Sequence, residues 1–133
     1  MNTISYKENG KGYILTTDII KSLYSDYLRN AADQLNPYAS PLLAKDLSGL
    51  PPAFVITAEF DPLRDEGEAY AVRLKEAGVV AAYTRYEGMI HGFINMGKVV
   101  DRALDAIKDA EIELNRIFQR TSNIDATIWD SYR

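Results

Sequence analysis

Two side chains in this sequence are of the types, and at a spacing, that suit acid–base chemistry: Asp61 and His91. His91 is the only histidine, and imidazole is the side chain best suited to take up and return a proton near neutral pH. A carboxylate that accepts a hydrogen bond from one ring nitrogen fixes the tautomer and leaves the other nitrogen free to act as a base. Each residue also has a plainer explanation, because Asp before Pro is most often a helix cap and a lone histidine is most often a loop residue.

The segment before Asp61 predicts the element that positions it. In Ala53–Ala58 only Thr57 is polar, and a short apolar run without alternation is typical of a strand buried on both faces of a parallel sheet. Asp61 and Pro62 then predict a helix start, with Asp as the N-cap and Pro at the first helical position. Asp61 is therefore expected at the C-terminal end of a parallel strand, where open α/β sheets keep their active sites.

The segment after Asp61 predicts a helix and a second strand. The helix has one apolar stripe and ends at Gly78; its stripe comprises Leu63, Gly67, Tyr70, Leu74 and Ala77. Val79–Tyr86 is rich in residues that favour strands, and a glycine-containing loop, Gly88–Gly97, follows with His91 in it. Asp61 and His91 are 91 − 61 = 30 residues apart, which leaves room for one helix and one strand. Adjacent parallel strands would bring both to the same edge of the sheet.

The rest of the chain completes an alternating pattern. Residues Met1–Leu15 are expected to be irregular, and a helix is expected from Thr16 to about Leu28, followed by loops broken at Pro37 and Pro41. A long helix follows Gly97, and the apolar residues on its predicted inner face are Val100, Ala103, Leu104, Ile107, Leu114, Ile117 and Phe118. We therefore predict one partial α/β domain over residues 1–119 and a polar C-terminal tail over 120–133, for which no function is inferred.

Composition excludes several classes of function. The chain has 133 residues, of which 47% are hydrophobic, and no apolar run long enough for a transmembrane helix, so a folded domain with no membrane partner is expected. A net charge of −4 argues against nucleic acid as a partner. The absence of cysteine fits a cytoplasmic protein. No metal or cofactor is expected, because the four carboxylates of Glu59–Glu66 have only His91 as a nitrogen ligand and the glycines near His91 form no phosphate loop.

The predicted order of elements leaves the sheet incomplete. Two parallel strands do not make a stable domain by themselves, because strands of this kind need neighbours at their edges. Ala53–Ala58 has the composition of a central strand, yet the chain supplies at most one partner for it. An unpaired apolar edge can pair with another chain. The sequence is therefore interpreted as part of a larger fold.

The nucleophile that would complete the chemistry is not found in this sequence. A nucleophile elbow needs Gly-x-Ser-x-Gly, because the glycines permit a sharp turn from strand to helix. None of the seven serines stands in that pattern, and there is no His-Gly-Gly stretch to supply oxyanion-hole amides. Asp61 and His91 are therefore expected to be two members of a triad in the order Ser, Asp, His, whose serine lies upstream of this chain.

Three groups of residues resemble the C-terminal part of the hormone-sensitive-lipase-like α/β hydrolases, a family of carboxylesterases, acetyl esterases and short-chain lipases. They are Ser40–Leu42, Asp61–Gly67 and His91–Phe93, and the resemblance extends over roughly Ser5–Phe118. It implies the last two strands of an α/β-hydrolase sheet, with Asp61 as the triad acid and His91 as the general base. It also implies that Ile90 and Phe93 flank the histidine at the substrate pocket.

Two functions follow as expectations. The first is the C-terminal portion of a serine carboxylic-ester hydrolase acting on a small ester, with no activity expected from the isolated chain because it lacks the serine. The second is a non-catalytic interaction module, whose exposed strand edge pairs with a copy of itself or with a separate N-terminal half.

Overall fold

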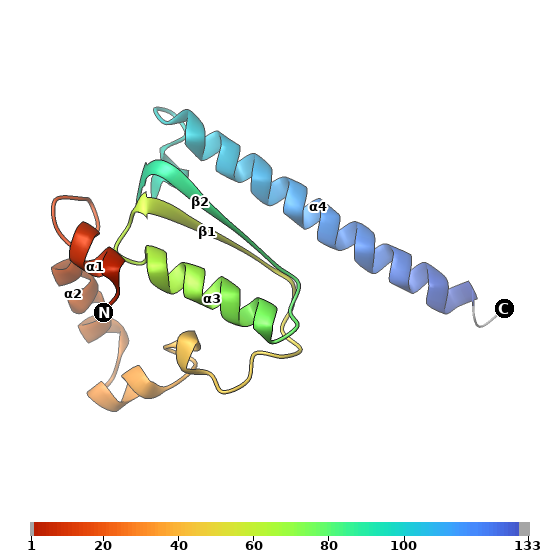
Figure 1. Ribbon diagram of the computed structural model, residues 1–133, viewed down its shortest axis with the longest axis horizontal. Helices are drawn as coiled ribbons and strands as arrows, with labels where there is room; N and C mark the ends of the chain where they lie inside the picture. Colours follow the sequence, from red (N-terminus) through yellow and green to blue (C-terminus); the bar gives the residue numbers. More distant parts are fainter. Residues whose placement is uncertain (1, 131–133) are drawn as a thin grey trace.

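Two parallel strands with a helix on each side form the centre of the molecule. The computed structural model describes residues 2–130, and side chains over 2–119. Strands β1 (Ala53–Phe60) and β2 (Ala81–Ile90) pair in parallel, and α3 (Arg64–Glu76) connects them. The sheet lies between α3 and the long helix α4 (Asp101–Asp130), as Figure 1 shows. The expected α/β class with a parallel pair is thus confirmed, and the described residues contain no third strand in this sheet.

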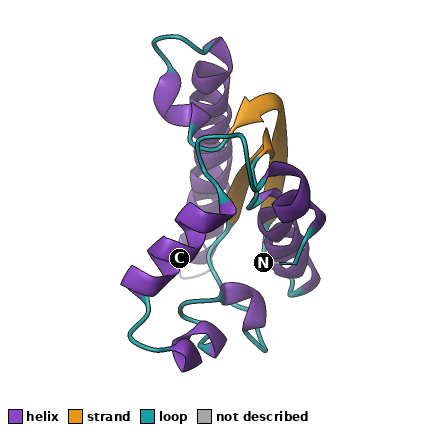
Figure 2. Cartoon of the chain, turned by 90° about the vertical axis from the view of Figure 1, so that its left-hand side faces the viewer, coloured by secondary structure: helices purple, strands orange, loops and turns teal. Residues whose placement is uncertain are grey.

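The segments before the sheet lie at one end of it and along α3 (Figures 1 and 2). They comprise α1 (Ile4–Asn9), α2 (Thr17–Tyr27) and the short 3-10 helices η1 (Ala31–Leu35) and η2 (Pro41–Leu43). The prediction of an irregular lead-in was wrong for α1. This helix forms because its inner residues, Ser5, Tyr6 and Asn9, are buried against the rest of the chain.

Helix α3 ends where the sequence predicted, but β2 starts two residues later than expected. Gly78 takes a φ of 80°, its N–H donates to the Lys75 carbonyl, and the Val79 N–H donates to the Leu74 carbonyl. These are the two bonds of a Schellman motif, which favours glycine at this position. Val79 therefore closes the helix and packs on Leu74, and β2 begins at Ala81.

Strand β2 also runs further than expected, through Ile90, which corrects the prediction of a loop from Gly88. Pairing is regular from Ala53 opposite Ala81 to Ala58 opposite Tyr86, and resumes with Phe60 opposite Ile90. Between these pairs β1 advances two residues and β2 four, so β2 carries a bulge. Gly88 permits it with a φ of 76°, and its N–H donates to the Glu59 carboxylate at 2.6 Å.

The sheet is less buried than its composition predicted. Only Thr57 and Ala58 of β1 are buried, and the other residues of the strand are half-buried. The prediction of a strand covered on both faces therefore fails for most of β1. The physical reason is that two strands with one helix on each side leave both edges of the sheet, and part of its faces, without cover in the described residues.

Helix α4 contacts the sheet with small residues. Ala103 and Ala106 are fully buried and share a cluster with Phe93, whereas the larger apolar residues of the predicted inner face, Leu104, Ile107, Leu114 and Phe118, are each at least half exposed. The prediction that these larger residues face the core was therefore wrong for this chain in the absence of a partner. The helix continues to Asp130 and projects beyond the sheet (Figure 1), and residues 131–133 of the predicted tail lie outside the described residues.

No helix among the described residues combines the length and the apolar character that a membrane span requires. The cytoplasmic location inferred from the absence of cysteine stays a prediction.

Candidate functional site

Asp61 lies directly after β1 and uses one carboxylate oxygen to shape its own loop. Oδ1 accepts a hydrogen bond from the Leu63 N–H at 2.8 Å, and the Asp61 carbonyl accepts from the Arg64 N–H at 3.1 Å. Helix α3 therefore begins at Arg64 with Leu63 as its N-cap, and the prediction of Asp61 as N-cap with Pro62 at the first helical position was wrong. Asp61 instead closes a turn that precedes the helix, and Asp61 itself is buried.

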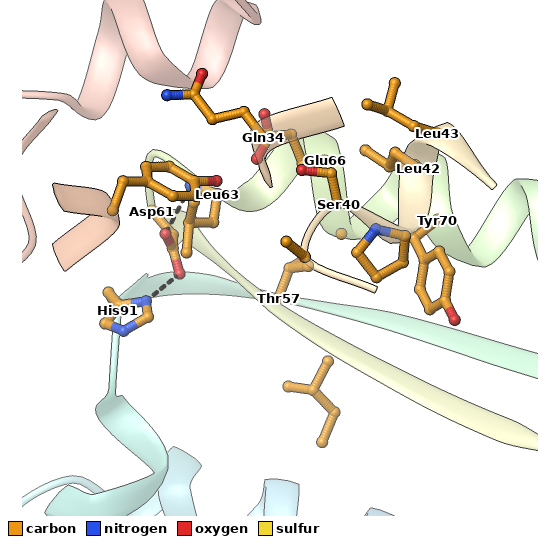
Figure 3. Close-up of a pocket in the computed structure, with 15 residues that line it drawn as sticks. Gln34, Ser40, Leu42, Leu43, Thr57, Asp61, Leu63, Glu66, Tyr70 and His91 are labelled. Atoms are coloured by element: carbon orange, nitrogen blue, oxygen red, sulfur yellow. Dashed lines mark hydrogen bonds and ion pairs between the residues drawn. The ribbon is translucent and has the colours of Figure 1, made fainter. Parts of the chain in front are cut away.

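The second oxygen of Asp61 contacts His91. Oδ2 lies 2.8 Å from His91 Nδ1, as the dashed line in Figure 3 shows. His91 follows β2 and precedes Gly92, whose φ of 76° turns the chain sharply into the 3-10 helix η3 (Phe93–Met96). The structure thus brings together the two residues that the sequence placed at one edge of the sheet.

The direction of this hydrogen bond sets the chemistry of the imidazole. An ionised carboxylate can only accept, so Nδ1 carries the proton in the neutral ring and Nε2 carries the lone pair. The His91 side chain is 42% exposed and that of Asp61 is 11% exposed. The carboxylate is therefore held inside the protein, while the ring it orients remains accessible to a reactant.

The pair lies beside a cleft of about 710 Å³ (Figure 3). The cleft runs between β1, α3 and the segment around η2. The residues that line it are Tyr24, Gln34, Ala39, Ser40, Pro41, Leu42, Leu43, Ile56, Thr57, Asp61, Leu63, Glu66, Gly67, Tyr70 and His91. The surface of this lining is mainly apolar, and its polar side chains include Gln34, Ser40, Thr57, Asp61, Glu66 and His91.

Ile90 and Phe93 lie beside His91 in the sequence, but neither lines this cleft. Ile90 pairs opposite Phe60 in the sheet, and Phe93 is buried against Tyr86, with ring centroids 5.2 Å apart. In the described part of the chain these residues support the strand and turn that carry His91. Their place at a substrate pocket stays a prediction.

Two phenols of one apolar cluster, those of Tyr24 in the cleft lining and of the buried Tyr6, are held in their neutral form. Burial raises the pKa of Tyr24, and the Glu66 carboxylate raises it further. The same two causes, in the same order, raise the pKa of the buried Tyr6 strongly. Both hydroxyl groups therefore remain protonated at physiological pH and can serve as hydrogen-bond donors rather than as bases.

Two of the carboxylates near Asp61 accept hydrogen bonds from other groups of this chain. Glu59 accepts from the Gly88 N–H, and Asp65 accepts from Arg64 and from the backbone of Ser5. Among the described residues no group of three or more potential ligands is close enough to hold a metal ion. The carboxylates of Glu59 and Asp65 thus bind backbone N–H groups and a guanidinium.

Residues that the sequence analysis did not connect with the site hold the backbone before Asp61. The Glu59 carbonyl accepts hydrogen bonds from Asn9 Nδ2 at 3.2 Å and from Arg64 Nη1 at 3.1 Å. Asn9 is almost fully buried although it is polar. Helix α1 has six residues, too few for a periodic pattern, so only the resemblance that begins near Ser5 signalled that this segment matters.

Comparisons with known proteins agree on one kind of protein. The profile of a family described as having the alpha/beta hydrolase fold matches residues 1–95. An arylesterase of Saccharolobus solfataricus is 49% identical over 85 residues, which cover 63% of this chain and 28% of the arylesterase. A carboxylic ester hydrolase of Mycobacterium tuberculosis, LipN, is 49% identical over 89 residues, 65% of this chain and 23% of that protein.

Solved structures give the same result for the backbone. The Pyrobaculum calidifontis esterase superposes with a TM-score of 0.82 at 45% identity, covering 88% of this chain and 39% of the esterase. An ester hydrolase from the metagenome of Lake Arreo superposes with a TM-score of 0.84 at 39% identity, covering 90% of this chain and 38% of that protein. The chain spans only 23–28% of the length of the two curated relatives above.

Proposed function

We propose, from the premise that this chain belongs to the α/β-hydrolase fold family, that it supplies the acid and the base of a serine carboxylic-ester hydrolase. Asp61 is the acid that orients the imidazole, and His91 is the general base. The observation that carries the proposal is the 2.8 Å contact between Asp61 Oδ2 and His91 Nδ1 at the C-terminal ends of two adjacent parallel strands.

The proposed reaction follows from this geometry. Nε2 of His91 takes the proton of a serine hydroxyl as its oxygen attacks the ester carbonyl, and the resulting imidazolium is stabilised by Asp61. The imidazolium then returns the proton to the leaving alcohol, which leaves an acyl-enzyme. In the second half, Nε2 takes a proton from water as the water oxygen attacks the acyl carbonyl. The imidazolium then returns that proton to the serine oxygen as the acyl–serine bond breaks, which releases the carboxylic acid and restores the serine.

In this proposal the serine and the oxyanion-hole amides come from a separate segment. The sequence has no Gly-x-Ser-x-Gly, and the chain spans about a quarter of the two curated relatives. Small carboxylic esters are the proposed substrates, because curated relatives include an arylesterase and an ethyl acetate hydrolase. The largely apolar lining of the cleft fits a small acyl or alcohol group.

The first prediction tests the roles of Asp61 and His91 in a complete hydrolase. In a chimera, this chain replaces the segment that it matches in the Pyrobaculum calidifontis esterase, with which it shares 45% identity. We expect hydrolysis of p-nitrophenyl acetate by the chimera, and a fall in kcat of roughly 10⁴-fold for Asp61→Ala and roughly 10⁶-fold for His91→Ala. A folded, active chimera that tolerates either substitution would refute the assigned roles.

The isolated chain is the matched control for this experiment. It is expected to hydrolyse the ester no faster than its Asp61→Asn and His91→Ala variants, because it has no activated serine. Turnover by the isolated chain that both substitutions abolish would show that these 133 residues contain a nucleophile of their own.

A second candidate function is an interaction module without catalysis. The observation that favours it is structural: in the described residues β1 pairs with β2 along one edge only, and α4 exposes Leu104, Ile107, Leu114 and Phe118. An edge strand and an apolar helix face are both surfaces that another chain can cover. The partner would be a second copy of this chain or a separate N-terminal half of the hydrolase.

A further inference from the structure

Helices α1 and α3 both begin without a cap from their own sequence. The N-cap of α1 is Thr3 and that of α3 is Leu63, and neither side chain makes a capping hydrogen bond. The first N–H groups of a helix have no partner within the helix and must find one elsewhere. Ser, Thr, Asp and Asn usually supply it from the N-cap position, as Thr16 does for α2.

Each of the two helices is capped by a side chain of the other. Asp65, in the first turn of α3, accepts the Ser5 N–H of α1 at its Oδ2, 2.8 Å away. Ser5 in turn accepts the Asp65 N–H at its Oγ, 3.3 Å away. The two residues are 60 positions apart in the sequence, and Ser5 is fully buried. We name this pair of bonds the reciprocal cap.

The reciprocal cap is joined to the loop that carries Asp61. The Ser5 hydroxyl donates to the Pro62 carbonyl at 2.7 Å, directly after Asp61, and Thr3 Oγ1 lies 2.9 Å from the same hydroxyl oxygen. On the other side of Asp61, Asn9 of α1 donates to the Glu59 carbonyl. Helix α1 therefore holds the backbone on both sides of the carboxylate that contacts His91.

The charge of Asp65 suits this arrangement. Although burial alone would raise the pKa of this carboxyl, the Ser5 N–H and the Arg64 guanidinium outweigh burial and lower the pKa. Arg64 bonds Asp65 at 2.9 Å and Glu8 of α1 at 3.1 Å. Asp65 thus remains an ionised acceptor at neutral pH and caps α1 as a carboxylate.

We propose that Ser5 and Asp65 are positioning residues, whose reciprocal cap holds the Asp61 carboxylate in place against the His91 ring. Neither residue touches the reacting atoms. Their catalytic meaning rests on the proposed function, but the positioning itself is a property of this chain. Without the cap, the Pro62 carbonyl and the first turn of α3 lose their fixed partner, and Oδ2 of Asp61 no longer stays at hydrogen-bonding distance from Nδ1.

The test measures the tautomer of His91 in the ¹⁵N-labelled full chain. Because His91 is the only histidine, ¹H–¹⁵N correlations from its carbon-bound ring protons report directly which nitrogen carries the proton. At about pH 9, above the ordinary titration range of histidine, we expect mainly Nδ1–H in the unsubstituted chain. Asp61→Ala is the reference for a ring without its carboxylate partner, and is expected to show mainly Nε2–H.

The variants separate positioning from general stability. In Ser5→Ala and Asp65→Ala, the ¹⁵N chemical shifts of both His91 ring nitrogens are expected to move most of the way to the values of Asp61→Ala. Asp65→Asn keeps an acceptor for the Ser5 N–H and is expected to retain most of the Nδ1–H form. Thr16→Ala is the matched control, because it removes the cap of α2 (Thr16 Oγ1 to the Ile19 N–H, 3.2 Å) and leaves the Asp61 loop untouched. It is expected to leave the tautomer unchanged. Circular dichroism on every variant measures the helix lost.

The outcomes distinguish this inference from the proposed function. If Ser5→Ala keeps the unsubstituted tautomer while Asp61→Ala loses it, the positioning role is refuted and the acid–base pair stands. If Thr16→Ala shifts the ring as far as Ser5→Ala does, the effect is loss of stability and the positioning role is again refuted. If the unsubstituted chain already matches Asp61→Ala, the two side chains are not paired, and both proposals fail.

Discussion

At the scale of single residues, Asp61 performs two structural tasks with its two carboxylate oxygens. Oδ1 closes the turn at Leu63, and Oδ2 contacts the imidazole, so the orientation of the carboxylate is determined before any substrate is present. An amide at this position could reproduce only one of these acceptors without turning its NH₂ group toward a donor. This explains physically why a carboxylate, rather than an amide, suits position 61 in the proposed mechanism.

Gly92 is the residue whose backbone conformation directs His91. Its φ is 76°, and a Cβ added there would meet nothing within 4 Å, so an alanine would be strained by its backbone alone. We predict that Gly92→Ala lowers the free energy of unfolding by about 1–2 kcal/mol and reduces kcat in the chimera by displacing His91. Urea denaturation and the p-nitrophenyl acetate assay measure the two effects.

Gly49 offers a matched control for that substitution. It has a φ of 71°, and a Cβ there would also meet nothing within 4 Å, but it lies in the turn before β1, away from His91. Gly49→Ala is expected to reduce stability by a similar amount and to leave kcat unchanged. Equal losses of kcat in both variants would show that strain at Gly92 has no specific effect on the imidazole.

At the scale of elements, α3 is the connection that places two strand ends side by side. It links β1 to β2 and packs on both strands, and its close approach to β1 depends on Gly67. A Cβ on Gly67 would lie 2.6 Å from Thr57 Cγ2, which is closer than two carbon atoms can pack. The absence of a side chain at Gly67 therefore determines how closely α3 packs on β1, the strand that precedes Asp61.

This packing predicts a compensated pair of substitutions. Gly67→Ala should gain about 1 kcal/mol of helix propensity but lose about 1–3 kcal/mol to overpacking, so a net decrease in the free energy of unfolding is expected. Thr57→Ser removes the methyl group that would clash and keeps the hydroxyl that contacts Tyr83 at 2.9 Å. In a double-mutant cycle by urea denaturation, the Thr57→Ser background should recover more than about 0.5 kcal/mol of the loss. Simple additivity would contradict the proposed contact.

Helix α4 carries apolar residues that the two-stranded sheet leaves exposed. Its apolar residues occur at helical spacing over more than one side of the helix, and among its residues up to 119 the fully buried side chains are those of Ala103 and Ala106. Leu104 and Ile107, about one turn apart, remain exposed next to these alanines. The helix therefore has more apolar surface than the sheet of this chain can bury.

At the scale of the whole molecule, the exposed apolar face of α4 and the open edge of β1 predict association. We expect the solution mass of the isolated chain, measured by light scattering, to rise with concentration, because apolar surface of this kind is rarely left uncovered. A double substitution, Leu104→Lys with Ile107→Lys, should lower the mass toward that of the monomer without reducing the helix content measured by circular dichroism. Lys108→Ala, on the same helix, is the control for a change of charge alone.

A folded chain whose mass is that of a monomer at all concentrations would contradict this prediction, and with it the pairing of this chain with a second copy of itself. Association alone would not decide between the two candidates, because an uncovered portion of a hydrolase also exposes this surface. The chimera decides between them, since only the hydrolase function requires that Asp61 and His91 serve a serine from another segment.

Several features of the fold and of the candidate site could be predicted from the sequence, because residues close to each feature indicate it. The apolar run before Asp61 predicted β1, and Gly78 predicted the end of α3. The single histidine, placed after the next strand, predicted the meeting at the sheet edge, and the structure agrees on all three. The resemblance to carboxylesterase-type α/β hydrolases is likewise confirmed by the comparisons. These features are encoded within a few residues of where they appear.

The tertiary structure alone decided what depends on distant partners. That α1 is a helix, that Ser5 and Asp65 cap each other across 60 residues, and that β2 bulges at Gly88 to meet Glu59 could not be predicted from local pattern. Each is stabilised by a hydrogen bond to a group far away in the chain, and short segments carry too few residues for periodicity to reveal them. The sequence by itself thus determined which side chains could do the chemistry and which strands carry them, whereas only the fold decided what holds them in place.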